Sequence, residues 1–366
     1  MIRFLDLKAI NKRFEPEFNQ VFKSFLDSGH YILGEEVGNF EQEFASYCGV
    51  KYCIGVSNGL DAISLIFAGY KELGVFKEGD EILVPANTYI ATVLAISNAG
   101  LKPKLVEPSL SSYNIDVNEI KKHITNKTRA ILGVHLYGQL YDAGALEAFC
   151  KLHDLMLIED AAQAHGAIYK DARKAGSLSA AAAFSFYPTK NLGALGDAGA
   201  ITTNKPELAK AITQLRNYGR TSTYKNKIKG RNCRLDEVQA TFLRVKLRIL
   251  DEDNNRRRNI AQYYLDNIKN DKLVLPECED IDGHVFHLFV IRSANRDDLK
   301  AYLLSQGIET LIHYPIPVHQ QGAYKELNNL KLSITEKIHD EVLSIPMHPL
   351  LEQSQIDNIV RALNRY

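Results

Sequence analysis

Short apolar runs alternate with helical patterns along the first two thirds of the chain. The runs predict strands at 53–56, 81–85, 103–106, 130–134, 155–159 and 182–186, with 200–203 as an antiparallel hairpin partner near the last of them. Apolar residues at helical spacing predict helices between them, at 36–47, 62–68, 88–99 and 143–153. Continuous apolar strands separated by helices are typical of a mainly parallel sheet that is covered on both faces. This part of the chain is therefore predicted to be an α/β domain.

The pattern changes near residue 235. Helices are predicted at 236–250, 260–268 and 296–306, and strands at 285–291 and shortly after Gly307. The strongly charged run 251–258 between the first two helices is interpreted as a solvated helix face. We therefore expect a large domain at 1–245 and a smaller α+β domain at 246–366.

Composition excludes several classes of protein. The chain has 366 residues and a formal net charge of zero, which argues against bulk electrostatic binding to nucleic acid or to a membrane surface. The five cysteines form no Cys-x-x-Cys pair or Cys/His cluster, so we expect reduced thiols and no metal site. A charged N-terminus and the absence of a 20-residue apolar stretch lead us to expect a cytoplasmic protein.

Lys190 is the first candidate for chemistry. It follows a short apolar strand and lies in a segment rich in small and polar residues, Ser185-Phe186-Tyr187-Pro188-Thr189-Lys190-Asn191-Leu192-Gly193. A lysine in that setting is typical of an amine that forms a Schiff base with an aldehyde cofactor. The alternative for the lysine alone is an exposed surface charge.

Polar residues at three other strand ends complete a candidate site. Asp160 ends the strand 155–159, where a carboxylate can hold the ring nitrogen of pyridoxal phosphate (PLP) protonated. The turn from Ser57 to Asp61 starts a helix and is a candidate phosphate site, to which Ser185 can add a hydroxyl donor. Tyr89 can stack on a cofactor ring. Taken singly, Asp160 and the turn also suit helix caps, and Tyr89 suits a core or rim position.

The chain resembles the sugar aminotransferases of the DegT/DnrJ/EryC1 family, which are fold-type I PLP enzymes. The resemblance covers essentially the whole chain and rests on Glu159-Asp160-Ala161-Ala162-Gln163, the Lys190 segment, Gly196-Asp197-Ala198-Gly199-Ala200 and Arg234-Leu235-Asp236-Glu237-Val238-Gln239-Ala240. It implies an α/β fold with a mainly parallel seven-stranded sheet flanked by helices, plus a smaller C-terminal α+β domain.

Within the family, the chain is most similar to the dTDP-3-amino-3,6-dideoxyhexose transaminases. This finer similarity rests on Ser57-Asn58-Gly59-Leu60-Asp61-Ala62, Pro85-Ala86-Asn87-Thr88-Tyr89-Ile90-Ala91-Thr92, Val134-His135-Leu136-Tyr137-Gly138-Gln139 and His313-Tyr314-Pro315-Ile316-Pro317.

The resemblance also implies roles for single residues. Gly59, Leu60 and Asp61 would cradle the phosphate, and Gln163 would lie near the ring hydroxyl of PLP. Asn232 would reach the phosphate in the partner subunit, which implies a homodimer with shared active sites. The family more often has serine where this chain has Cys233, which puts any hydrogen bond from that hydroxyl in doubt. The implied substrate-binding residues are Tyr31, Tyr187, His313 and Tyr314.

The expected reaction transfers an amino group from L-glutamate to C3 of a dTDP-3-keto-6-deoxyhexose. The product would supply a surface glycan or an antibiotic sugar. Alternatives are a 4-aminotransferase acting on a UDP-4-keto-6-deoxy sugar and a non-enzymatic regulator or sensor on the same scaffold. Relatives that dehydrate sugars carry histidine in place of the lysine, so Lys190 argues against dehydration.

Overall fold

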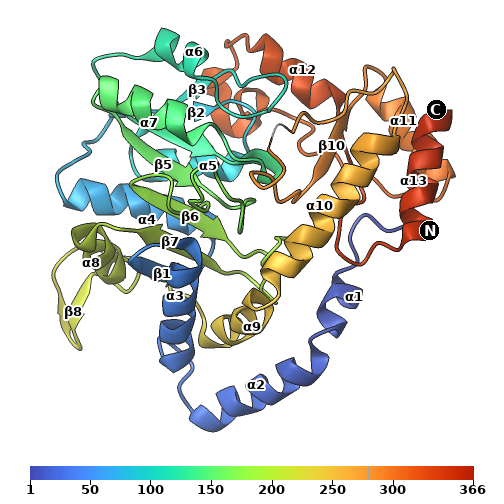
Figure 1. Cartoon of the computed structure of the whole chain (residues 1–366). Coiled ribbons are helices and arrows are strands. Elements are labelled where there is room, and N and C mark those ends of the chain that lie inside the picture. Colours follow the sequence, from blue (N-terminus) through green and yellow to red (C-terminus); the bar gives the residue numbers. More distant parts are fainter. Residues whose placement is uncertain (279) are drawn as a thin grey trace.

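A seven-stranded sheet forms the centre of the computed structural model, which describes residues 1–278 and 280–366 (Figure 1). The strand order is β1-β7-β6-β5-β4-β2-β3, in which β7 is antiparallel to both of its neighbours and the other pairs are parallel. The predicted α/β fold, with its hairpin partner at 200–203, is therefore confirmed. The strands are β1 (Tyr52–Val56), β2 (Glu81–Pro85), β3 (Lys102–Val106), β4 (Thr128–Val134), β5 (Met156–Asp160), β6 (Ala181–Ser185) and β7 (Gly199–Thr203).

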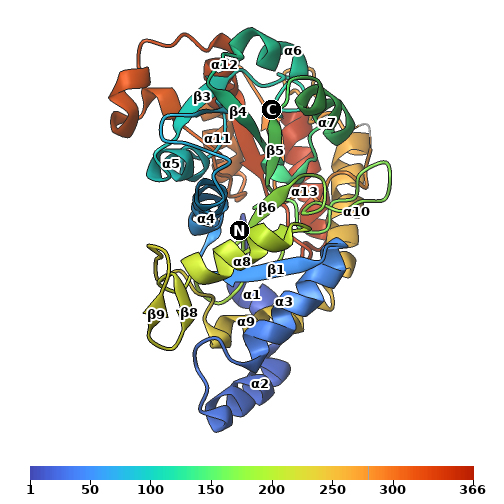
Figure 2. The same ribbon diagram turned by 90° about the vertical axis from the view of Figure 1, so that its left-hand side faces the viewer.

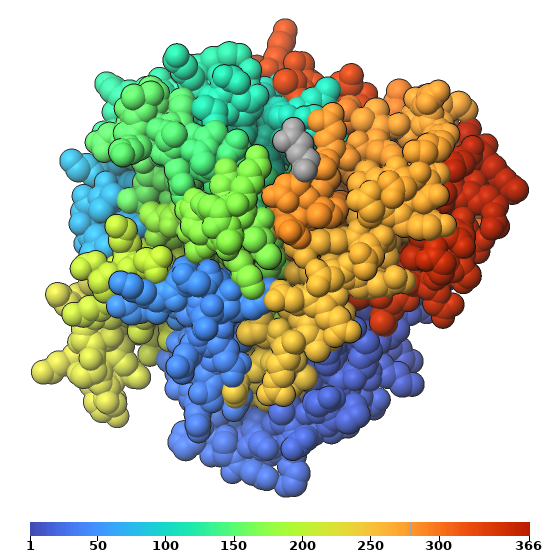
Figure 3. Space-filling model, in the orientation of Figure 1, coloured from blue at the N-terminus to red at the C-terminus, as the bar shows by residue number. Residues whose placement is uncertain are grey.

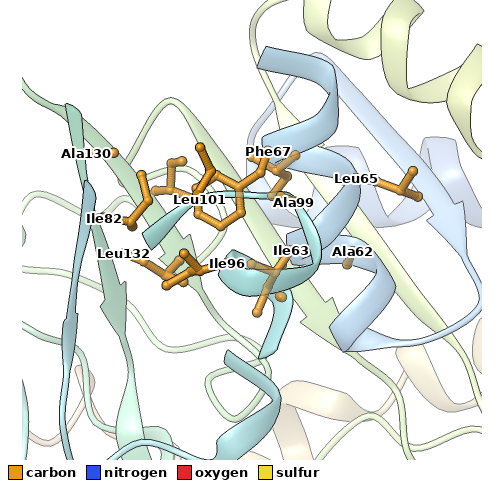
Figure 4. Packing of buried hydrophobic residues seen from close by; sticks show 14 of the residues in the cluster. Ala62, Ile63, Leu65, Phe67, Ile82, Ile96, Ala99, Leu101, Ala130 and Leu132 are labelled. Carbon is orange, nitrogen blue, oxygen red and sulfur yellow. The ribbon is translucent and has the colours of Figure 1, made fainter. Parts of the chain in front are cut away.

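Helices cover both faces of the sheet. Helices α4 (Gly59–Glu72) and α5 (Ile90–Asn98) lie on one side, and α3 (Glu35–Cys48) and α7 (Ala143–Leu152) lie on the other (Figure 2). Figure 4 shows the first of these interfaces, where Phe67 of α4 and Ile96 of α5 pack with Ile82 and Leu132 of the strands. On the other face, Phe44 of α3 packs edge-on against Phe184 at 4.9 Å between ring centroids.

The C-terminal part has its own apolar core around a two-stranded antiparallel sheet. It also includes Ile2, so the N-terminal segment packs against the C-terminal part, beside which it lies in Figure 3. The elements from α8 onward are α8 (Pro206–Leu215), β8 (Arg220–Ser222), β9 (Lys225–Asn226), α9 (Glu237–Leu247), α10 (Leu250–Asn267), β10 (Phe289–Arg292), α11 (Arg296–Ser305), α12 (Ser333–Glu341), β11 (Val342–Ile345) and α13 (Gln353–Arg365).

The remaining elements are short or N-terminal. They are α1 (Leu7–Lys12), α2 (Glu15–Ser28), α6 (Val117–Ile120) and the 3-10 turns η1 (Lys121–His123), η2 (Leu136–Gly138), η3 (Val318–Gln320) and η4 (Gly322–Leu327). Residues 245 and 246, where the sequence places the domain boundary, lie in the last turn of α9. Within residues 1–278 and 280–366, no helix combines the length and the apolar character that crossing a membrane requires.

Three predictions for the C-terminal part need correction. The strand expected at 285–291 begins only at Phe289, because the amides of Val285 and Leu288 donate instead to the carbonyls of Gly138 and Tyr137. At 308–312, directly after Gly307, the structure has no regular strand and only single bridges made by Ile308 and Leu311.

The charged run 251–258 is also not a fully solvated helix face. It forms the first half of α10, and the residues Arg257 and Arg258 are only 4% and 9% exposed. Arg258 donates to the backbone carbonyls of Ile281, Asp282 and His284. These acceptors are distant in sequence, so charge patterning alone does not reveal that the arginines are buried.

Candidate active site

A cavity of about 520 Å³ lies beyond the carboxyl ends of the central strands. Open α/β sheets bind their ligands at this edge. The cavity brings together ten of the thirteen residues that the sequence assigned to the site: Gly59, Leu60, Tyr89, Asp160, Gln163, Ser185, Tyr187, Lys190, His313 and Tyr314. Nothing in residues 1–278 or 280–366 groups three or more metal-ligating side chains.

Lys190 lies in a tight turn after β6. Its amide donates to the carbonyl of Tyr187 at 2.8 Å, and a side chain at Gly193 would lie within 2.4 Å of the carbonyl oxygen of Pro188. The turn closes because Gly193 has no side chain. Lys190 is half-buried as a whole residue at the cavity, and burial of its amine lowers the pKa of Lys190 to about 8. About a tenth of the amine is therefore neutral, and nucleophilic, at pH 7, far more than for an ordinary lysine.

Asp160 is buried at the end of β5. Its Oδ2 accepts a hydrogen bond from the Thr92 hydroxyl at 2.8 Å, and its Oδ1 accepts one from the Ala162 amide at 3.1 Å. Burial raises the pKa of the Asp160 carboxyl, whereas these two hydrogen bonds favour the ionised form. The carboxylate is thus fixed in orientation at the cavity wall, where it can pair with a cation.

Helix α4 begins in the wall of the same cavity. Asn58 caps the helix through a 2.8 Å hydrogen bond from the Asp61 amide, and the first amides of a helix have no intrahelical acceptor. Gly59 is required here because a β-carbon would come within 2.7 Å of the Ser185 β-carbon. The backbone at Gly59 and Leu60 and the hydroxyl of Ser185 therefore border one corner that suits an anion.

Asp61 does not line this corner. Its carboxylate accepts hydrogen bonds from Ser57 at 2.5 Å and from the side-chain amide of Asn58 at 2.9 Å. The structure therefore places Asp61 in the cap of α4, behind the backbone that borders the cavity.

Gln163 and several aromatic residues form the rest of the wall. The Gln163 side-chain amide donates to the Tyr314 hydroxyl at 3.1 Å, and the Tyr314 ring lies 5.0 Å from the ring of Tyr89. Burial raises the pKa of Tyr314 well above its ordinary value, so its hydroxyl stays protonated. Tyr187 and Tyr89 are about half exposed, at 53% and 52%, and lie at the rim.

His313 lies beside Tyr314. Its Nδ1 is 2.8 Å from the Ser344 hydroxyl, and its burial lowers the pKa of His313 to about 4. His313 is therefore a neutral imidazole at physiological pH, able to form hydrogen bonds but not to supply a charge.

Besides Asp61, two of the predicted residues lie outside the cavity. Tyr31 is 49% exposed and packs against Phe25 at 5.0 Å between ring centroids. Asn232 is exposed and forms an isolated bridge with Asn217. Within one chain, neither side chain contributes to the candidate site.

Sequence reasoning missed other residues that line the cavity. Thr92 lies on α5 and orients Asp160 through its hydroxyl. The sequence around Thr92 contains no motif that indicates this contact. His287 is also part of the wall, and its Nδ1 is 3.2 Å from the Asn191 side-chain oxygen. The only sequence signal for His287 is its position inside an otherwise apolar run, which is weak evidence for a site residue.

The cavity thus combines a lysine of lowered pKa, a carboxylate of fixed orientation and a corner that suits an anion. Residues 12–364 match the DegT/DnrJ/EryC1/StrS aminotransferase family. The chain belongs to this family. It is 54% identical over 366 residues to the dTDP-3-amino-3,6-dideoxy-alpha-D-galactopyranose transaminase of Aneurinibacillus thermoaerophilus, covering 100% of this chain and 99% of that one.

The chain is also similar to a second curated transaminase and to a solved aminotransferase structure. The dTDP-3-amino-3,4,6-trideoxy-alpha-D-glucose transaminase of Streptomyces venezuelae is 43% identical, with 100% of this chain and 96% of that protein covered. The crystal structure of S. venezuelae DesV in complex with ketimine intermediate superposes with a TM-score of 0.95 at 43% identity, covering 100% of this chain and 98% of that chain. The chain is therefore a PLP-dependent aminotransferase by family.

The residues present fit PLP. Asp160 could pair with the ring nitrogen, and Lys190 could supply the amine that holds the aldehyde. The uncapped amides at the start of α4 and the Ser185 hydroxyl lie in one anion corner of the same cavity. The cavity volume of about 520 Å³ lies within the range of small-molecule sites, roughly 300–1,000 Å³.

Proposed function

We propose that this aminotransferase transfers the amino group of L-glutamate to C3 of a dTDP-3-keto-6-deoxyhexose. The product would be a dTDP-3-amino-3,6-dideoxyhexose that supplies a surface glycan or an antibiotic sugar. The observation that carries the proposal is Lys190 at the cavity, with Asp160 in the same wall. The sugar specificity is supported by the names of the two relatives, both of which are transaminases of 3-amino sugars linked to dTDP.

When bound, PLP would supply an electron sink for the bonding electrons left when the donor loses its α-proton. Asp160 keeps the ring nitrogen protonated, because its carboxylate is held by Thr92 and by the Ala162 amide. The amides of Gly59 and Leu60, with the Ser185 hydroxyl, bind the phosphate. Gln163, which is buried and fixed by its hydrogen bonds, lies near the ring hydroxyl.

Lys190 is the general acid and base. A pKa of about 8 lets its side chain exist in both the neutral and the protonated forms near the working pH. The Lys190 amine would accept the α-proton of the amino acid, and in the return half of the cycle the ammonium would deliver a proton to C3 of the sugar. Tyr89 is placed to stack on the cofactor ring, and Tyr187, His313 and Tyr314 border the space for the sugar.

The proposed working form is a cytoplasmic homodimer. Tyr31 and Asn232 are exposed and lie outside the cavity of their own chain, so a second copy can bring them to the partner's site. Asn232 would then bind the phosphate of the partner's cofactor, and Tyr31 would lie near the nucleotide-sugar. Residues 1–245 would form the cofactor-binding domain and 246–366 the smaller domain.

The test is a product analysis. The protein is incubated with L-glutamate and each of the two dTDP-3-keto-6-deoxyhexoses that differ at C4, and the product is identified by mass spectrometry and NMR. We expect an amino group at C3. Amination only of a UDP-4-keto-6-deoxy sugar would support the 4-aminotransferase, and no turnover of any sugar would favour the sensor. Lys190→Ala should abolish turnover, whereas Lys151→Ala, which changes an exposed lysine on α7, should not.

A further inference from the structure

A second cavity adjoins the candidate active site. It has a volume of about 450 Å³ and shares Thr189, His287 and His313 with the first cavity. It lies between the N-terminal segment, α10 and α11. Most of its walls are apolar, made by Phe4, Leu5, Leu7, Leu288, Leu304, Leu311 and Met347. A small molecule in this space would lie next to the turn that carries Lys190.

Arg257 is a buried cation on the wall of this second cavity. Its side chain is 4% exposed, and its Nη1 donates to the carbonyls of Phe286 at 3.2 Å and Met347 at 2.8 Å. In the described part of the chain, no carboxylate lies within 4 Å of its guanidinium, and Nε and Nη2 have no hydrogen-bond acceptor. A buried charge without a counter-ion is costly, so the guanidinium favours an anion that enters the cavity.

Two more polar groups line the same cavity. The Thr310 residue is 8% exposed, and its buried hydroxyl has no hydrogen-bond partner among the described residues. Lys300 is half-buried on α11 and forms no ion pair within the part of the chain that the structure describes. The Glu309 carboxylate opposes these cations but already accepts a hydrogen bond from the Phe4 amide at 3.2 Å. The cavity walls thus contain two cationic side chains, Arg257 and Lys300, and one carboxylate, Glu309, which leaves a net positive charge.

We propose that this second cavity binds the amino donor, and that Arg257, Thr310 and Lys300 hold one carboxylate of a short aliphatic dicarboxylic acid. The apolar walls suit the methylene groups of such an acid, and Thr189, which directly precedes Lys190, lines both cavities. Tyr89 and Tyr187 line only the first cavity, so the bound carboxylate of the donor and the sugar would occupy different parts of the site. This inference rests on the proposed transfer of an amino group from an amino acid.

The experiment uses the holoenzyme and glutarate, a five-carbon dicarboxylate with no amino group to transfer. Its binding is measured by calorimetry for the wild type, Arg257→Gln, Thr310→Val and Lys300→Met, with Lys151→Met as a control for loss of an exposed lysine. We expect the glutarate Kd to rise about tenfold or more in Arg257→Gln and about three- to tenfold in Thr310→Val. Lys300→Met should raise it about two- to fivefold, because the ammonium is partly solvated.

A kinetic measurement separates this inference from the proposed function. In the same variants, the KM for L-glutamate should rise relative to the KM for the keto sugar. Thr310→Val removes a hydroxyl that bonds to nothing, so its fold should be intact even if Arg257→Gln fails to fold. The inference is overturned if Thr310→Val and Lys300→Met both bind glutarate as the wild type does. If the sugar assignment alone is wrong, the loss of glutarate binding persists while the dTDP-sugar is not aminated.

Discussion

Replacing Lys190 with methionine is expected to stabilise the protein once its cofactor has been removed. A pKa that falls from 10.5 to about 8 makes the protonated lysine about 3 kcal/mol less favourable in the folded protein than in the unfolded chain. Methionine has a similar length and carries no charge. The unfolding free energy of the variant should therefore be higher by up to about 3 kcal/mol at pH 7. The gain is smaller to the extent that solvent screens the charge of the half-buried Lys190.

The pH dependence identifies the cause. Between pH 8 and pH 10.5 the unfolded chain holds the proton while folded Lys190 has lost it, so the stability of the wild type rises with pH across this window. The advantage of Lys190→Met should be full below pH 8 and vanish near pH 10.5. Urea unfolding at fixed protein concentration measures the stability difference below pH 8 and near pH 10.5. Lys151→Met, which changes an exposed lysine, is the control. An equal stability at pH 7, or a gap that does not change with pH, would refute the reasoning.

Three further predictions follow from single contacts. Thr92→Val removes the hydrogen bond to Asp160 and should lower kcat/KM about tenfold in steady-state kinetics; an unchanged value would contradict the role of Thr92. Gly59→Ala brings a β-carbon to 2.7 Å from that of Ser185 and should weaken PLP binding about tenfold in a fluorescence titration; wild-type affinity would argue against this phosphate corner. Phe44→Ala empties a fully buried position and should cost about 3–5 kcal/mol in urea unfolding; a loss below 1 kcal/mol would contradict the packing described.

The sheet was predictable because each of its strands is a local apolar run. The strands of the C-terminal part were harder to predict, because backbone amides there form hydrogen bonds with residues that are distant in sequence. Phe286 lies in an apolar run but has a φ of 42°, and its neighbours donate to η2 instead of to a strand. The burial of Arg257 likewise depends on the carbonyls of Phe286 and Met347, which no charge pattern at 251–258 can indicate.

The candidate site was predictable where chemistry follows a strand end, as at Asp160, Ser185 and Lys190. Side chains that support these residues from another element were missed, since Thr92 reaches Asp160 from α5 across 68 residues of sequence. Asn232, like Tyr31, came only from the resemblance, and its proposed role requires a second chain.

The most direct test of the account is to identify the lysine that binds PLP. The holoenzyme is reduced with borohydride and digested, and the peptide that carries the pyridoxyl group is sequenced by mass spectrometry. We expect a single modified lysine, Lys190, and no modified peptide from Lys190→Ala treated in the same way. A pyridoxyl group on another lysine of the wild type, or an unmodified wild type that still transfers amino groups, would contradict the account.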